Sequence, residues 1–222
     1  MKLDFSSVWQ YWPFLYHGAL TTLKITAITA VFGFLLGVLL SLIKISKCRP
    51  LVWFGNFYTS IFRGTPLLVQ LCIVHFGLPQ LTGMTLTTMQ SGVLTCSLKS
   101  AAYISEIFRG VINAIDRGQY EAAMSLGVGY RDMMKDIILP QAVKHILPSL
   151  VNEAISLLKE SSILSYIGAV ELLRAADQIT VLTFRFFEPY LVIAVIYYVL
   201  VMLLSMVASW IERWVNRSDR VS

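Results

Sequence analysis

Five long apolar stretches alternate with shorter polar segments along the chain. They lie at about residues 19–43, 51–78, 85–112, 146–168 and 189–211. A helix needs about 20 residues to cross the hydrocarbon core of a bilayer, so each stretch is long enough for one span. Arg63 and Lys99 interrupt the second and third stretches. We keep both as spans because a helix satisfies its backbone polar groups within one segment. The pattern predicts an all-α integral membrane protein with about five transmembrane helices.

The composition supports this class. The 222 residues are 56% hydrophobic and 14% charged, and the mean hydropathy is +0.68, whereas soluble domains carry roughly 25% charged residues. One membrane domain, residues 1–222, accounts for the length. The net charge of +5 does not indicate nucleic-acid binding, because the basic residues fall between the apolar stretches. The cysteines have no metal-ligand spacing and are expected to be free thiols: Cys48, Cys72 and Cys96.

The distribution of lysine and arginine predicts the orientation of the spans. The second connection, around residues 79–85, has no basic residue, and the fourth, around residues 171–188, balances two arginines with three acids. Basic residues gather instead in the first connection, in and just before the third, and in the tail: Lys44, Lys47, Arg49, Arg109, Arg117, Arg131, Lys135, Lys144, Arg213, Arg217 and Arg220. The positive-inside rule therefore predicts an N-terminus outside and a C-terminus in the cytoplasm.

The first 13 residues lack the basic region and the cleavage site of a signal peptide. Their apolar residues, Phe5, Val8, Trp9 and Trp12, have the spacing of an amphipathic segment. Such a segment is expected to lie on the membrane surface. The sequence does not decide whether it lies there or spans part of the bilayer.

The connection between the third and fourth spans, about residues 113–145, mixes polar and apolar residues. Asp116 can cap a short helix, with Gln119 in the reciprocal position of a capping box. Gly127 and Gly129 are expected to stop that helix, since glycine readily adopts the left-handed cap conformation. A second short helix is expected over residues 130–139, ending at Pro140. The prediction is two short helices with an elbow on the cytoplasmic face.

Seven positions of this connection have a specific spacing: Glu121-Ala122-Ala123, then Gly127, then Ile137, Leu139 and Pro140. The spacing resembles the EAA motif of permeases in ATP-binding-cassette importers. The resemblance implies that the loop docks on a separate ATPase through Glu121, Ala122, Ala123, Gly127 and Pro140. The alternative is an amphipathic helical hairpin on the bilayer surface, which requires no partner but does not explain the glycine and proline positions.

Three further runs occur in order along the chain: residues 62–70, residues 100–110, and residues 152–162 with Asn152-Glu153 and Lys159-Glu160-Ser161-Ser162. They resemble the polar amino acid uptake branch of these permeases, the HisM/HisQ-like amino acid permease family. The resemblance covers nearly the whole chain. It implies a multi-pass subunit in the bacterial cytoplasmic (inner) membrane. The expected partners are two ATPase subunits, a second permease copy or paralogue, an extracytoplasmic substrate-binding protein, membrane lipid and an amino acid substrate.

Charged residues inside spans cost roughly 3 kcal/mol each on insertion scales, so each is a candidate for function. Glu153, Ser156 and Glu160 share one helix face, and Lys99, Tyr103 and Glu106 form a similar stripe on the preceding span. Facing polar stripes can hold a zwitterion, with acids for its ammonium group and a cation for its carboxylate. The predicted substrate site is Lys99, Ser100, Tyr103, Glu153, Ser156 and Glu160.

An alternative reading is that these charges only pair with each other, Lys99 with Glu160 or Arg63 with Glu106, and lock the helices together. Lys99 also departs from the amino acid branch, where a small polar residue is more common at this position. The identity of the amino acid therefore stays open, as does the choice between identical and related permease copies.

The chain has no Gly-x-x-x-x-Gly-Lys-Ser/Thr loop for ATP phosphates and no His-rich or Cys-rich metal cluster. We therefore expect no cofactor or metal in this chain, no enzymatic activity of its own, and ATP and Mg²⁺ bound by the partner ATPase. The predicted function is the membrane subunit of an ATP-driven importer of a polar amino acid. Two alternatives stay open: a secondary transporter driven by an ion gradient, and a membrane scaffold that transports nothing.

Overall fold

A computed structural model describes residues 3–216, apart from the side chains of residues 7, 117 and 214–216. The described chain is helical, as the hydrophobic pattern predicts. Its elements are α1 (Ser6–Trp9), α2 (Trp12–Ile45), α3 (Arg49–Gly64), α4 (Leu67–Cys72), the π-helix η1 (Ile73–Gly77), α5 (Leu78–Thr82), α6 (Thr88–Ala114), α7 (Arg117–Ser125), α8 (Tyr130–Asp132), the π-helix η2 (Met133–Ile138), α9 (Leu139–Glu160), the 3₁₀-helix η3 (Ser161–Ile167), α10 (Leu172–Thr183) and α11 (Phe187–Asn216). Arg217 and Arg220, used above for orientation, lie outside the described residues.

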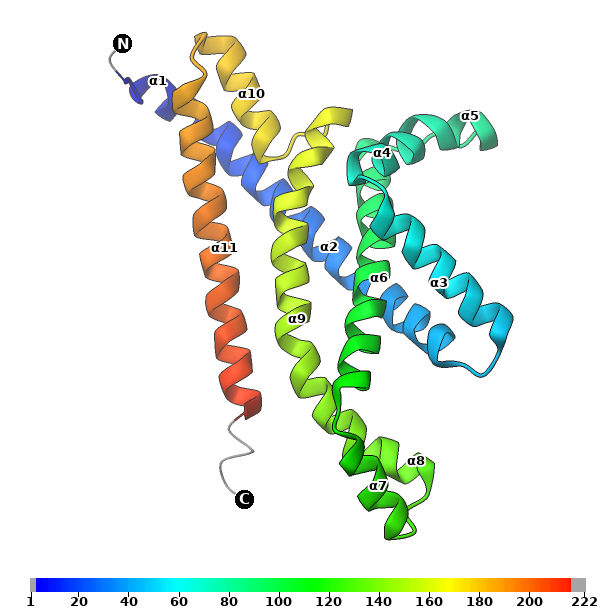
Figure 1. Ribbon diagram of the computed structural model, residues 1–222. Helices are drawn as coiled ribbons and strands as arrows, with labels where there is room; N and C mark the ends of the chain where they lie inside the picture. Colours follow the sequence, from blue (N-terminus) through cyan, green and yellow to red (C-terminus); the bar gives the residue numbers. More distant parts are fainter. Residues whose placement is uncertain (1–2, 217–222) are drawn as a thin grey trace.

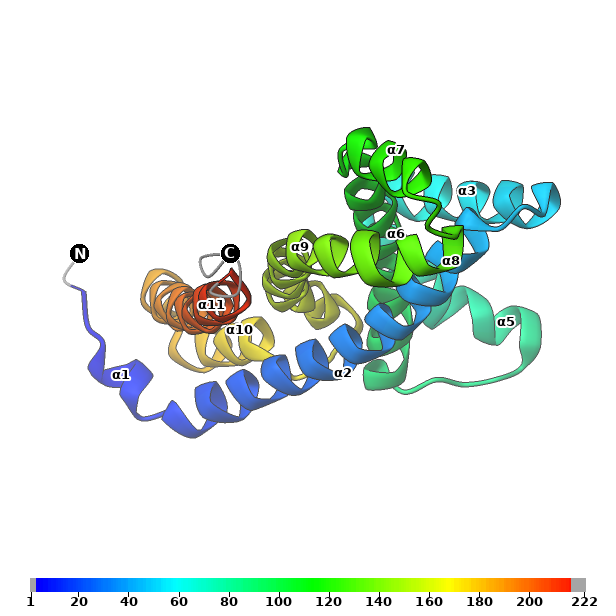
Figure 2. The ribbon, with the colours of Figure 1, turned by 90° about the horizontal axis from the view of Figure 1, so that it is seen from below.

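Three long helices, α6, α9 and α11, lie alongside one another with α9 antiparallel to the other two, and α2 crosses them obliquely (Figures 1 and 2). The helices α7 and α8 project from one end of this bundle, whereas α1, α5 and α10 lie at the other (Figure 1). The last turns of α11 lie toward the end that carries α7 and α8 (Figure 1). The described termini are therefore near opposite ends of the bundle.

Two glycines let α2 approach α6 closely. A Cβ atom on Gly33 would lie 2.8 Å from the Cβ of Ser100, and one on Gly37 would lie 2.6 Å from Cγ2 of Ile104. Small residues four apart are a common contact between membrane helices, because lipid tails provide no hydrophobic driving force and close packing must hold the helices together. The crossing of α2 over α6 places Ser100 at the centre of the bundle, where it is fully buried.

The second apolar stretch is not one continuous helix. The chain bends by 107° between α3 and the helical run from Leu67 to Thr82. Pro66 has no N–H for a helical hydrogen bond and disfavours the helical conformation at Thr65, which is extended. The Gln70 side chain then donates to the Phe62 carbonyl at 3.0 Å and so pairs a group at the end of α3. One continuous helix over residues 51–78 is therefore not present, and whether the bent pair forms a single span stays a prediction.

By length and composition, two described helices qualify as membrane spans, α2 and α11, or three if the bent pair counts as one. The charged helices α6 and α9 do not pass the same test. The other boundaries are near those expected, except that α2 begins at Trp12 and the fourth stretch starts earlier and ends as the 3₁₀-helix η3. The all-α class is confirmed, and the count of five spans stays a prediction.

The N-terminal segment packs on the junction between α10 and α11. Val8 is 2% exposed and belongs to a cluster with Leu15, Leu172 and Ile193. An oxygen of Asp4 lies 3.5 Å from Arg185, and hydrogen bonds from Ser6 hold the pKa of the Asp4 carboxyl below its usual value. Trp9 and Trp12 are exposed and meet edge to face with ring centres 5.2 Å apart. Contact of this segment with the membrane surface stays a prediction.

The fourth connection contains a helix, α10, rather than a plain polar loop. Glu171 caps this helix through the N–H groups of Leu173 and Arg174 and also accepts a hydrogen bond from the Tyr197 hydroxyl at 2.9 Å. It is fully buried, and burial raises the pKa of its carboxyl. The Thr22 hydroxyl accepts from the Leu172 N–H. These bonds join α2, α10 and α11 beside the long helices.

Candidate functional site

A buried ion pair joins α6 to α9. Lys99 Nζ lies 2.6 Å and 2.7 Å from the two carboxylate oxygens of Glu160. The same nitrogen lies 4.4 Å from the centre of the Tyr103 ring. Lys99 is 6% exposed, and a charge this deep in a protein needs a partner, because its desolvation costs several kcal/mol. The pairing that the sequence left as an alternative is therefore present.

A second acid lies close by and lacks such a partner. Glu153 is 8% exposed, and its Oε1 atom has no hydrogen-bond partner among the described residues. The buried hydroxyl of Ser100 interacts with the Glu153 side chain and has no other hydrogen-bond partner within the described chain. Both residues line a cavity of about 170 Å³ between α2, α6 and α9, with Ala30, Phe34, Ile104, Leu150, Ala154 and Leu157. Unpaired buried polar atoms are expensive, so this cavity has the chemistry of a site for a polar ligand.

The structure thus divides the six predicted substrate residues. Lys99, Tyr103 and Glu160 lie together, and Ser100 and Glu153 line the adjacent cavity. Ser156 lies on α9 between the two acids, but its hydroxyl donates to the Asn152 carbonyl at 3.0 Å. Its part in substrate binding stays a prediction, as do the roles of the other five.

Further along α6, Glu106 binds three cations, and we call these four residues the Glu106 cluster. Lys44 donates to one carboxylate oxygen. Arg109 lies 2.7 Å and Arg63 3.5 Å from the other. The Arg63–Glu106 pair that the sequence left as an alternative is present. The contact of Lys44 with Glu106 was not predicted, because a lysine beside a connection was used only to orient the spans. The signal was Gly55: a Cβ there would lie 2.7 Å from Cγ of Lys44, so α3 leaves room for the lysine stem.

The predicted coupling loop has the expected elbow, but the residues that begin and end its helices do so differently from the prediction. Asp116 caps α7, but it does so through the Gly118 N–H at 2.8 Å and without the predicted bond to Gln119. Gly127 has φ +72° and follows the end of α7, as predicted. Gly129 instead has φ −63° and ψ 148°, which is extended backbone, and it precedes α8. The prediction for Gly129 as a left-handed stop is wrong.

Pro140 does not end a helix. The backbone from Tyr130 runs through α8 and the π-helix η2 directly into α9, and Pro140 is the second residue of α9. Proline is tolerated at such a start, and the wider π turn ahead of it relieves the need for a regular hydrogen bond. The loop and the helix that carries Glu153 and Glu160 are therefore one continuous helical run. The prediction of a break between them is wrong.

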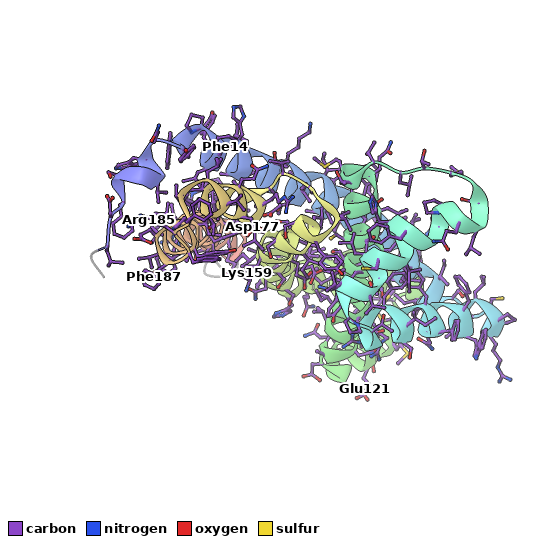
Figure 3. All side chains as sticks on the ribbon, turned by 90° about the horizontal axis from the view of Figure 1, so that it is seen from above. Phe14, Glu121, Lys159, Asp177, Arg185 and Phe187 are labelled. Carbon is purple, nitrogen blue, oxygen red and sulfur yellow. The ribbon has the colours of Figure 1, made fainter. Side chains whose placement is uncertain are left out.

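The face of the loop that points away from the bundle is exposed. Ala123 is buried against Ile115, Met133 and Ile138, which holds α7 on η2. Glu121 projects at the edge of the molecule (Figure 3), while Phe14, Asp177, Arg185 and Phe187 are labelled around the opposite end. Exposed apolar side chains occur on the same helix and shortly after it: Met124 is 62%, Leu126 83% and Tyr130 69% exposed. A hollow of about 620 Å³ lies between this helix and the end of α6. Exposed apolar patches occur at contacts with proteins or with membranes, so docking of an ATPase on this face stays a prediction.

Two known proteins match this chain over most of its length. The chain is 50% identical over 219 residues to the arginine transport system permease protein ArtQ of Bacillus subtilis (strain 168), covering 99% of this chain and 100% of that protein. It is 48% identical over 200 residues to the putative glutamine transport system permease protein GlnP of Rickettsia felis, covering 90% of this chain and 92% of that one.

A solved structure described as an amino acid ABC transporter with histidines superposes with a TM-score of 0.92. It is 44% identical and covers 96% of this chain and 99% of that chain. Residues 31–218 match the family described as binding-protein-dependent transport system inner membrane component. The chain belongs to this family of inner membrane transport components.

Proposed function

We propose that this chain is the membrane subunit of an ATP-driven importer that carries a polar amino acid into the cell. The observation that carries the proposal is α9. This one helix begins at the end of the exposed loop, at Leu139, and ends at Glu160 in the buried ion pair, with Glu153 between them. Its 22 residues span about 33 Å, so a single helix, which lacks one backbone hydrogen bond at Pro148, links the loop to the two acids.

The buried charges suit the two ends of an amino acid. The ammonium group of the substrate binds Glu153, whose Oε1 atom has no partner among the described residues. The carboxylate of the substrate binds Lys99 and displaces Glu160, which then accepts a polar or cationic side chain. Ser100 and Tyr103 complete the site from α6. Each hydrogen bond to a charged group contributes about 1.5–3 kcal/mol, so two such contacts give selective binding.

The exposed loop face supports docking of a separate ATPase. Glu121 and Ala122 contact the partner together with the exposed apolar side chains around them, whereas Ala123 fixes α7 to η2. Closure of the ATPase moves α7, and Gly127 together with the continuous run from Tyr130 to Pro140 passes the motion to α9. ATP and Mg²⁺ bind the ATPase, and this chain contributes no catalytic group.

The complex contains two ATPase subunits, two permease copies, identical or related, and an extracytoplasmic binding protein. The loop end of the bundle faces the cytoplasm and the end with α1 and α10 faces outward. The concentration of basic residues in the first and third connections supports this orientation. It places the N-terminus outside and the C-terminus in the cytoplasm of the bacterial inner membrane.

Reconstitution of the chain with its ATPase and binding protein in proteoliposomes tests the proposal. We expect uptake of a polar amino acid that stops when ATP is replaced by a non-hydrolysable analogue. Uptake driven by an ion gradient alone would favour a secondary transporter. ATPase binding without any uptake would favour a scaffold. The relatives named for arginine and glutamine make these two amino acids the first substrates to assay.

A further inference from the structure

Helix α3 has a polar exposed face that packing does not explain. Asn56, Ser60 and Arg63 are all exposed and share one side of the helix, at intervals of four and three residues. The neighbouring exposed side is apolar, and Trp53 and Phe57 stack there with ring centres 5.4 Å apart. Lipid suits the apolar side, while a polar face in hydrocarbon is costly. The polar side of α3 therefore borders water.

Arg63 connects this face to the ion pair of Lys99 and Glu160. Its guanidinium carbon lies 5.5 Å from the centre of the Tyr103 ring, and Lys99 Nζ lies 4.4 Å from the same centre. Two cations thus flank one aromatic ring, which attracts both through its electron-rich face. Lys99 belongs to the buried pair with Glu160, whereas the side chain of Arg63 is 47% exposed. The Tyr103 ring therefore contacts both a buried lysine and a half-exposed arginine.

The charges around Arg63 leave room for another anion. Glu106 binds Lys44, Arg63 and Arg109, so the described cluster holds three cations and one carboxylate. Arg109 donates to Glu106 through two nitrogens, at 3.1 Å and 2.7 Å. Arg63 makes a longer contact, 3.5 Å, and a guanidinium has five N–H donors. Arg63 is therefore the half-exposed cation of this cluster that both contacts Tyr103 and makes only a long contact with Glu106.

We propose that Arg63 is a second binding station for the substrate carboxylate, on the cytoplasmic side of Lys99. The inference rests on the proposed function. Glu160 pairs with Lys99 again as the substrate leaves, and Arg63 takes over the carboxylate. Tyr103 separates the two stations, and Asn56 and Ser60 line the polar path that continues from them along α3. A bidentate arginine fits a carboxylate better than lysine does, which favours directed release.

The test replaces Arg63 by cysteine in the assembled importer, with Cys48, Cys72 and Cys96 changed to serine or alanine. A cationic methanethiosulfonate reagent then restores a positive charge at position 63, and neutral and anionic reagents of similar length serve as comparisons. Arg49→Cys is the matched control, because Arg49 is an exposed arginine at the other end of the same helix, at the first position of α3. The unmodified importer, assayed in parallel for ATP-dependent uptake, tests the proposed function separately.

We expect Arg63→Cys to lower the maximal uptake rate about tenfold, the effect of losing one charged hydrogen-bonding partner, with the external KM unchanged. The cationic reagent restores uptake, the other reagents do not, and amino acid inside the vesicles slows the modification. Arg49→Cys has no such effect.

Three results would overturn the proposal. The first is uptake by Arg63→Cys within about twofold of its cysteine-free parent. The second is equal rescue by the neutral reagent, which would show that Arg63 only fills space. The third is a defect that appears only in vesicles containing anionic phospholipid, which would assign Arg63 to a lipid phosphate.

Discussion

Gly127 offers a clean perturbation of the coupling loop. Its φ of +72° lies in the left-handed region, which costs other residues about 1–2 kcal/mol and β-branched residues more. A Cβ at this position would meet nothing within 4 Å, so Gly127→Val acts on the backbone and not through a clash within the chain. We therefore expect the elbow to be destabilised by about 2 kcal/mol, which lowers the population of the docking conformation roughly 30-fold.

The assay measures ATP-dependent uptake and membrane insertion side by side. Gly127→Val is expected to insert normally and to lose most of its uptake. Gly127→Asn is the matched control, since asparagine tolerates the left-handed conformation and is larger than alanine. Normal uptake by the valine variant would refute the reasoning. Equal loss in both variants would assign the defect to contact with the ATPase rather than to backbone conformation.

Two further predictions concern the buried charges and the crossing of α2 over α6. Glu160→Gln should lower the free energy of unfolding of the purified complex by about 3–5 kcal/mol, because it leaves the buried charge of Lys99 without its partner. Lys99→Gln should cost less, because the Glu160 side chain is 27% exposed, and the double variant should lose less than the sum of the two. Additive losses would show that the two residues do not act as a pair. Gly37→Val should destabilise the complex by about 1–3 kcal/mol, because the larger side chain overpacks against Ile104. Gly110→Ala is the control: its Cβ has open space around it, so the melting temperature should not fall. A melting temperature of Gly37→Val equal to that of the parent would contradict the close crossing.

The long-range pattern of the sequence predicted the helical class and the position of the loop, because both follow from where the long apolar stretches begin and end. The approach of Lys99 to Glu160 was foreseeable as an alternative, since each buried charge requires a partner. Lys44 was missed because a lysine at a span end is ordinarily solvated, and only the space left by Gly55 indicates otherwise.

Predictions from single residues were wrong where one residue type is compatible with two local structures. Proline is common both just after the end of a helix and at the start of one. At Pro140 the π-helix η2 continues into α9, so this proline lies at the start of a helix and does not end one. In Thr65-Pro66 the same residue type broke a stretch that hydropathy treated as one span. Glu171 looked like a loop charge because Tyr197, the side chain that donates to it, comes from α11, a later helix.

The most direct test of the account is binding of a radiolabelled amino acid to the purified permease–ATPase complex, without the binding protein, together with ATP-driven uptake. Glu153→Gln keeps the size of the side chain and removes the charge that the substrate ammonium requires. The account predicts that this variant assembles with the ATPase but binds amino acid at least about tenfold more weakly and loses uptake in proportion. Unchanged binding and uptake in Glu153→Gln would contradict the central claim that this cavity carries the substrate.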